Sequence, residues 1–295
     1  MRQHRLGWTG IPVPVVGQGT WQMEVEDRAA CVDALRRGID AGMTHVDTAE
    51  LYGGGVVEEL IGEAIVGRRD EVFLVSKVLP HNASYEGTLA ACARSLRRLR
   101  TDRLDMYLLH WPGNHPLAET LRAFERLERD GKIRFWGLSN FDEADLEQAV
   151  ALAGERRIAC NQVLYHLLER SIEHRVIPVC ERHDIAVVAY SPFGSGGFPR
   201  PPHAGAAVLE AIARARGATA RQVALRFLAR RSFSSDGGSD GAGARPGVLV
   251  IPKAANAAHA AENARAADLE LTAEELRRIG ESFPLGEDRG GLPVL

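Results

Sequence analysis

The chain has 295 residues, of which 45% are hydrophobic and 25% are charged, and its net charge at pH 7 is −3. This composition is typical of a folded α/β chain, and the small net charge argues against a basic surface for nucleic acid or anionic membranes. No apolar run approaches the roughly 20 residues that a membrane span requires. The first residues lack the apolar core of a signal peptide, and the four cysteines form no CxxC pair. We therefore expect a reduced, cytoplasmic protein.

Short β-branched segments alternate along the chain with segments whose apolar residues recur about every 3.6 positions. The eight short segments cover residues 12–19, 44–48, 71–77, 104–110, 133–139, 158–163, 185–191 and 247–253. Eight strand–helix units over about 250 residues are typical of a (β/α)8 TIM barrel. A doubly wound parallel sheet is the alternative fold class, but it rarely contains eight regular units in a chain of this length.

Three further segments complete the expected organisation of a single domain over residues 1–295. Residues 2–13 resemble a β-hairpin that precedes the first barrel strand and could plug the N-terminal mouth. Residues 232–247 are rich in Gly, Ser and Asp and follow the seventh helix, so we expect a flexible insertion at the end opposite the chemistry. A short C-terminal tail ends the chain.

Polar residues recur at the carboxyl ends of the predicted strands. They are Asp47, Lys77, His110, Ser139, Asn140, Gln162, Tyr190 and Ser191. Each has an ordinary structural explanation, since an aspartate caps helices, a lysine leaves a strand for solvent and a histidine bonds within a core. The carboxyl ends of barrel strands share one mouth, however, so we expect these side chains to converge.

The stretch THVDTAELYG, residues 44–53, places Tyr52 five positions after Asp47. A phenol has a pKa near ~10 and is a weak acid–base catalyst at neutral pH. A nearby ammonium such as Lys77 lowers that pKa, and a carboxylate such as Asp47 keeps the ammonium charged. His110 would add a hydrogen-bond donor for a developing oxyanion. This set of groups suits protonation of a carbonyl oxygen while a hydride reaches the carbon.

The chain resembles the aldo-keto reductase family over nearly its whole length. The motifs VDTAELYG, SKV and LLHWP match the catalytic tetrad of that family in order and spacing, and GQGTW, GLSNF, NQV, YSPFG and IPK match its cofactor segments. The resemblance is nearest to a bacterial branch with methylglyoxal-type reductases. It implies an NADP(H)-dependent oxidoreductase that reduces aldehydes and ketones to alcohols and acts as a monomer.

The resemblance also implies roles for individual residues. Tyr52 would be the general acid, Lys77 and Asp47 would tune it, and His110 would orient the carbonyl. The implied cofactor contacts are Gly19, Thr20, Trp21, Asp47, Ser139, Asn140, Gln162, Tyr190, Ser191, Pro192, Gly194, Ile251, Lys253, His259, Glu262 and Asn263. The implied substrate pocket consists of Trp21, Tyr52, His110 and Trp111, although core packing is the other explanation for both tryptophans.

The segment after the last strand departs from the family pattern at two positions. Lys253 is present as a charge for the 2′-phosphate, but Ala254 replaces a common serine and His259 a common arginine. We therefore expect NADPH to be preferred, with NADH as a weaker alternative. The short tail offers little material for a large specificity loop, so small aldehydes and dicarbonyls are the expected substrates.

Other functions stay open at this point. Lys77 could instead form a Schiff base in an aldolase-like lyase. The chain could also be a non-catalytic subunit that senses the cofactor. A metal-dependent hydrolase would need motifs such as HxH or HExxH, which do not occur among the ten histidines, so we expect no metal. Nucleic-acid and membrane partners are likewise not expected.

Overall fold

The computed structural model describes residues 1–230, 247–288 and 290–295. Its main sheet has eight strands that pair in the order β10-β9-β8-β7-β6-β5-β4-β3. The strands are β3 Gln18–Gly19, β4 His45–Asp47, β5 Phe73–Val78, β6 Leu104–Leu109, β7 Ile133–Ser139, β8 Ile158–Leu164, β9 Ala186–Tyr190 and β10 Val248–Ile251. Parallel bridges between Val16 and Val250 and between Gly19 and Lys253 join the two edges of the sheet. The predicted barrel is confirmed.

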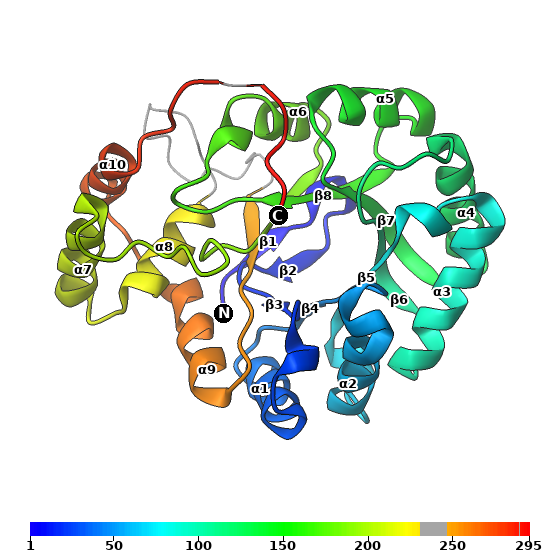
Figure 1. Cartoon of the computed structure of the whole chain (residues 1–295), viewed down its shortest axis with the longest axis horizontal. Coiled ribbons are helices and arrows are strands. Elements are labelled where there is room, and N and C mark those ends of the chain that lie inside the picture. Colours follow the sequence, from blue (N-terminus) through cyan, green and yellow to red (C-terminus); the bar gives the residue numbers. More distant parts are fainter. Residues whose placement is uncertain (231–246, 289) are drawn as a thin grey trace.

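Helices surround the strands (Figure 1). They are α1 Arg28–Asp40, α2 Val56–Ala64, α3 Tyr85–Leu99, α4 Leu117–Arg129, α5 Glu143–Ala153, α6 Val176–Arg182, α7 Ala204–Arg216, α8 Ala220–Leu228, α9 Ala257–Arg265 and α10 Ala273–Ser282. Several begin with the side-chain caps that their sequences offer. Ser84 caps α3, for example, and Thr219 forms a capping box with Gln222 at the start of α8. The strand–helix alternation is not fully regular, because both α7 and α8 lie between β9 and β10.

The predicted first strand, residues 12–19, was wrong as one element. The structure divides it into β2 Pro12–Pro14, which pairs antiparallel with β1 Gln3–Arg5, and the short barrel strand β3. Pro12 and Pro14 have no backbone N–H to donate to a neighbouring strand. A segment with these prolines therefore suits the edge of a two-stranded hairpin better than a central barrel strand. The N-terminal hairpin itself is confirmed.

The hairpin packs against the N-terminal ends of the barrel strands. Leu6 and Val13 are fully buried and cluster with barrel-interior residues such as Val75 and Met106. The indole Nε1 of Trp8 donates to the carbonyl oxygen of Ile158, the first residue of β8, at 3.0 Å. The chemistry-bearing residues are thereby left to the opposite, carboxyl ends of the strands.

A run of glycines shapes the turn after β4. The short 3-10 helix η3, Tyr52–Gly55, contains Gly53 and Gly54 with φ angles of 56° and 62°. Only glycine adopts this left-handed conformation without a steric penalty. The sequence YGGG therefore reverses the chain immediately after Tyr52 and fixes this residue beside the end of β4.

The two ends of the described chain differ in their relation to the barrel. The C-terminal segment runs back across one face and ends near the middle of the ring of strands (Figure 1).

The predicted insertion, residues 232–247, lies outside the described residues except for Gly247. Within the described residues, the helices are too short or too polar to cross a membrane.

Candidate active site

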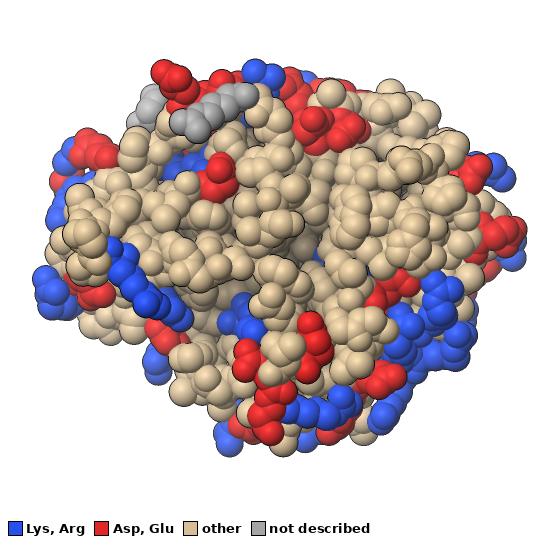
Figure 2. Space-filling view, viewed as in Figure 1, with Lys and Arg blue, Asp and Glu red and all other residues tan. Residues whose placement is uncertain are grey.

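A cavity of about 880 Å³ opens at the carboxyl ends of the barrel strands. Figure 2 shows the hollow near the middle of a face whose central part is mostly uncharged. Most of the predicted site residues line this cavity: Gly19, Thr20, Trp21, Asp47, Tyr52, His110, Trp111, Ser139, Asn140, Gln162, Tyr190, Ser191, Pro192, Ile251 and Lys253. The convergence expected from the strand ends is therefore present in the structure.

Lys77 lies fully buried beneath the cavity and joins two of its lining residues. Its Nζ donates to Asp47 Oδ1 at 2.6 Å, to the carbonyl oxygen of Thr48 at 2.9 Å and to Tyr52 Oη at 3.3 Å. Burial alone would lower the pKa of Lys77, but the charge and hydrogen bond of Asp47, with Tyr52, outweigh it and raise that pKa. The amine is thus a charged, immobilised group, which is the wrong state for a Schiff-base nucleophile.

Tyr52 behaves differently from the expectation of a lowered pKa. Burial raises the pKa of its phenol, and the opposing effect of Lys77 does not cancel that rise. The sequence predicts the partner and the direction of its influence correctly. It does not reveal how far the hydroxyl is removed from water, which is the larger effect. The phenol is consequently protonated at neutral pH.

His110 lies beside Tyr52, with ring centroids 5.9 Å apart in an edge-to-face arrangement. Burial, together with the Lys77 charge, lowers the pKa of His110 to about 2, so the ring is neutral. Its buried Nδ1 has no hydrogen-bond partner in the described part of the chain. A neutral imidazole with an unused polar atom next to a protonated phenol can help to hold a small polar group between them.

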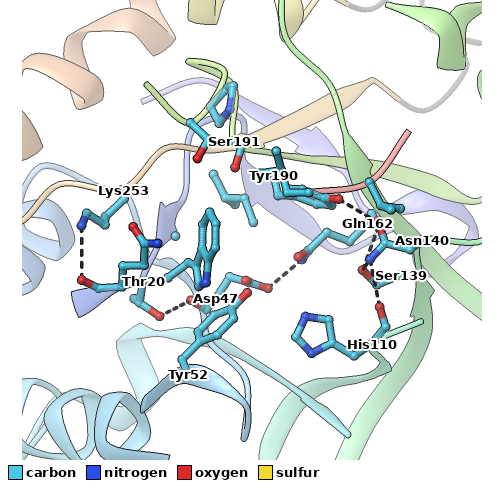
Figure 3. A pocket seen from close by; sticks show the side chains of 18 of the residues that line it. Thr20, Asp47, Tyr52, His110, Ser139, Asn140, Gln162, Tyr190, Ser191 and Lys253 are labelled. Atoms are coloured by element: carbon cyan, nitrogen blue, oxygen red, sulfur yellow. Dashed lines mark hydrogen bonds between the residues drawn. The ribbon is translucent and has the colours of Figure 1, made fainter. Parts of the chain in front are cut away.

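A hydrogen-bond network links the remaining polar residues to the tetrad (Figure 3). Gln162 Nε2 donates to Asp47 Oδ2 at 2.7 Å, and the Ser139 hydroxyl donates to the Gln162 carbonyl oxygen at 2.9 Å. Asn140 Nδ2 donates to the His110 carbonyl oxygen at 3.0 Å and its Oδ1 accepts from the Tyr190 hydroxyl at 2.9 Å. Strands β4, β5, β7, β8 and β9 thus each contribute a side chain to one connected network. His110, which follows β6, contributes its backbone carbonyl oxygen.

Lys253 lies at the edge of the cavity and is already paired. Its Nζ donates to Glu26 Oε1 at 2.8 Å and to the Gln22 carbonyl oxygen at 3.3 Å. Neither contact was expected from the sequence, because Glu26 belongs to the distant segment before α1. An incoming anion therefore meets an ammonium whose charge is partly balanced.

Four predicted cofactor contacts lie outside the lining of the cavity. Gly194 is in the loop after β9, next to the ring of His166. His259 is exposed; its backbone N–H donates to Asn256 Oδ1 at 2.9 Å, and Asn256 Nδ2 lies 3.0 Å from its ring Nδ1. Glu262 accepts from the Thr219 hydroxyl at 2.7 Å, and Asn263 is buried in α9. Their roles toward a cofactor stay predictions.

The cavity is also lined by residues that no sequence motif marks individually as functional. They are Gln22, Leu51, Pro112, Phe193, Ser195, Gly196, Arg221, Val294 and Leu295. Phe193, Ser195 and Gly196 belong to or follow the quoted segment YSPFG, which was a usable signal. The last two residues of the chain gave none, because only the path of the tail brings them to the mouth.

Comparison with known proteins assigns the chain to a family. The model of the Aldo/keto reductase family matches residues 15–282. The methylglyoxal reductase YeaE of Escherichia coli (strain K12) is 41% identical over 298 aligned positions, which span 100% of both chains. The glyoxal reductase of Bacillus subtilis (strain 168) is 33% identical and covers 92% of this chain and 89% of its own length. This chain belongs to the aldo/keto reductase family.

Solved structures agree with this assignment. An aldo/keto reductase from Klebsiella pneumoniae, crystallised with NADP and acetate, is 42% identical, covers 100% of both chains and has a TM-score of 0.89. A structure of an aldo-keto reductase from the same organism in complex with NADPH has the same identity, coverage and TM-score.

In the described part of the present chain, no group of three or more His, Cys, Asp and Glu residues is arranged to hold a metal ion.

Proposed function

We propose that this chain reduces small aldehydes and dicarbonyls to alcohols with NADPH, and that Tyr52 protonates the carbonyl oxygen. The observation that carries the proposal is the hydrogen-bonded series Asp47–Lys77–Tyr52, which ends at the cavity in a protonated phenol. Its relatives include a methylglyoxal reductase and a glyoxal reductase, and its structural neighbours were crystallised with NADP and NADPH.

The proton passes from Tyr52 Oη to the substrate oxygen. When the carbonyl carbon gains a hydride, its oxygen becomes an alkoxide and takes the phenol proton. Lys77 stabilises the phenolate that remains, because its ammonium lies 3.3 Å from the phenol oxygen and stays charged through Asp47. The pKa of Tyr52 is raised in the resting site, so the acid form is the one that meets the substrate.

His110 is proposed to orient the carbonyl. As a neutral ring with a pKa near 2, it offers one N–H donor without competing for the proton of Tyr52. A cation at this position would repel Lys77, whose charge contributes to the lowered pKa. Both residues line the cavity and their ring centroids are only 5.9 Å apart, which supports a joint action of the two donors on one carbonyl oxygen.

The lining residues fit a nicotinamide dinucleotide. The ring of Tyr190 and the amides of Asn140 and Gln162 offer a stacking face and partners for a carboxamide, while Lys253 offers a cation for phosphate. NADPH, when bound, supplies the hydride. Because Gln162 also bonds Asp47, the group proposed to hold the cofactor is tied directly to the acid–base series.

Small substrates suit the mouth of the cavity. Its apolar lining includes Trp21, Leu51 and Trp111, together with the chain's last residues Val294 and Leu295. The two tryptophans are 38% and 37% exposed, which supports a role in the pocket wall rather than in the core. The tail thus narrows the mouth although it is short.

A panel of carbonyl compounds tests the proposed function. NADPH oxidation should be measured with methylglyoxal, glyoxal, a short aliphatic aldehyde, a bulky cyclic ketone and a sugar aldehyde. We expect the highest kcat/KM with the dicarbonyls and the lowest with the bulky ketone. Absence of carbonyl-dependent NADPH oxidation across the panel, with NADPH binding intact, would favour a non-catalytic cofactor-sensing protein instead.

A further inference from the structure

Arg221 lines the same cavity, and none of the motifs in the sequence pointed to it. It is the second residue of α8, and its half-buried guanidinium lies 5.2 Å from the centre of the Phe193 ring and 5.5 Å from that of Phe198. Among the described residues, no carboxylate forms an ion pair with it. Its position is therefore fixed by two aromatic rings, while its N–H groups keep their capacity to bind an anion.

The charges that line the cavity are few. Within the described chain, Lys253 and Arg221 are its cationic lining residues, since His110 is neutral, and Asp47 is already bonded to Lys77 and Gln162. Lys253 is held by Glu26 at 2.8 Å. Of these two cations in the described chain, Arg221 is therefore the one whose charge no acidic side chain neutralises, and it is available to a ligand with several phosphate charges.

The position of Arg221 along the cavity indicates which phosphate it meets. Phe193, on which the guanidinium packs, follows Tyr190 by three residues, and Tyr190 bonds Asn140, which in turn bonds the carbonyl of His110. Arg221 thus packs on the loop that directly follows Tyr190, the proposed nicotinamide-stacking residue, whereas Lys253 is bonded to Gln22 and Glu26. In a dinucleotide, the diphosphate is separated from the nicotinamide by one ribose, whereas the 2′-phosphate lies at the far adenosine end.

We propose that Arg221 binds the diphosphate of the nicotinamide dinucleotide, an inference that rests on the proposed reductase function. A guanidinium can contact phosphate oxygens in a bidentate manner, and the aromatic support reduces the entropy lost on binding. The proposal assigns the charge recognition of NADPH to two separate residues: Arg221 meets the diphosphate, and Lys253 meets the 2′-phosphate.

Nucleotide binding to purified variants tests this division. Dissociation constants of NADPH, NADH, ADP-ribose and 2′-AMP should be measured by calorimetry for wild type, Arg221→Gln and Arg221→Lys. We expect Arg221→Gln to weaken NADPH, NADH and ADP-ribose by a similar factor of about tenfold or more, the equivalent of one lost charged hydrogen bond. Binding of 2′-AMP, which has no diphosphate, should change less than twofold, and Arg221→Lys should be intermediate.

A neighbouring arginine provides the matched control. Arg214 is exposed on α7 and does not line the cavity, so Arg214→Gln should bind all four nucleotides like wild type. Wild-type affinity of Arg221→Gln for ADP-ribose would overturn the proposal, and so would weakening confined to NADPH and 2′-AMP. Thermal unfolding of each variant excludes misfolding as the cause. If wild type oxidises NADPH with methylglyoxal while Arg221→Gln binds normally, only the assignment of Arg221 fails. If wild type does not bind NADPH, the reductase function and this assignment fail together.

Discussion

The ammonium of Lys77 lies 3.3 Å from the phenol oxygen of Tyr52 and 5.0 Å from the centre of its ring. The lysine is fully buried beneath the cavity, so in the proposed reaction it would act on a substrate only through the phenol. The catalytic role proposed for the lysine therefore requires no contact with a substrate. It also makes the roles of Lys77 in stability and in catalysis separable by experiment.

Lys77→Met should reduce both stability and activity. The substitution leaves the carboxylate of Asp47 buried without its cation, which typically costs about 3–5 kcal/mol in the free energy of unfolding. It also removes the charge that stabilises the phenolate, so we expect kcat to fall by at least ~100-fold. The double variant Asp47→Asn, Lys77→Met should recover much of the stability and none of the activity. Recovery of kcat in the double variant would show that Lys77 has only a structural role.

His110 should act as a neutral donor. Because burial lowers its pKa to about 2, the kcat profile between pH 5 and pH 8 should show no inflection that depends on this residue. His110→Gln, which keeps a neutral N–H donor, should retain more activity than His110→Ala, for which we expect a loss of about 100-fold in kcat. Equal losses in the two variants would contradict the role of a donor, and an inflection removed by His110→Gln would contradict its neutrality.

Acid should destabilise the fold partly through His45. This side chain is fully buried beside the tetrad, and burial lowers its pKa to about 4. The unfolded chain binds the proton near pH ~6.5 and the folded chain only near pH 4, so stability is present above pH ~6.5 and is lost as the pH falls toward 4. When the pH is lowered from 6.5 to 4.5, the free energy of unfolding of His45→Leu, measured in urea, should decrease by about 2 kcal/mol less than that of wild type.

An exposed histidine serves as the control for that measurement. His81 lies on the surface at the start of the segment before α3, so His81→Leu should follow the wild-type dependence on pH. If His45→Leu lost as much stability as wild type over this interval, then His45 would not be the group that couples folding to acid.

The pairing of Lys253 with Glu26 should weaken the recognition of the 2′-phosphate. Lys253→Met is expected to raise the KM for NADPH much more than the KM for NADH, because only NADPH carries that phosphate. Glu26→Gln removes the competing carboxylate and should lower the KM for NADPH by a few-fold, with Asp33→Asn on α1 as a control. Equal effects of Lys253→Met on both cofactors would show that Lys253 does not contact the 2′-phosphate.

Local sequence was sufficient to predict the barrel and the clustering of Asp47, Tyr52, Lys77 and His110, whose catalytic roles stay predictions. Asp47, Lys77 and His110 lie at or beside the carboxyl ends of their strands, and the ends of parallel strands in a barrel converge whatever the details of the loops. The glycines after Tyr52 mark the turn that holds it. The prediction of the first strand was wrong. Residues 12–19 form one apolar run, and nothing in this run marks the point between β2 and β3 where the chain passes from the hairpin into the barrel.

Features that depend on distant packing could not be predicted. Glu26 forms an ion pair with Lys253. Arg221 packs on two phenylalanine rings and lines the cavity, and Leu295 lines its mouth. None of these contacts has a signature in the sequence. The raised pKa of Tyr52 belongs to the same class. Its direction depends on the balance between burial and the Lys77 charge, and burial is a property of the whole fold.

The central claim is that Tyr52 is the proton donor in carbonyl reduction. Tyr52→Phe removes one oxygen from the site and leaves the ring, so NADPH should bind with nearly wild-type affinity. We expect kcat for methylglyoxal reduction to fall by ~10²–10⁴-fold, the usual contribution of general acid catalysis. The measurement is NADPH oxidation by wild type and variant at saturating methylglyoxal, with NADPH affinity determined separately by calorimetry. A variant that binds NADPH normally and retains more than about a tenth of the wild-type kcat would contradict the claim.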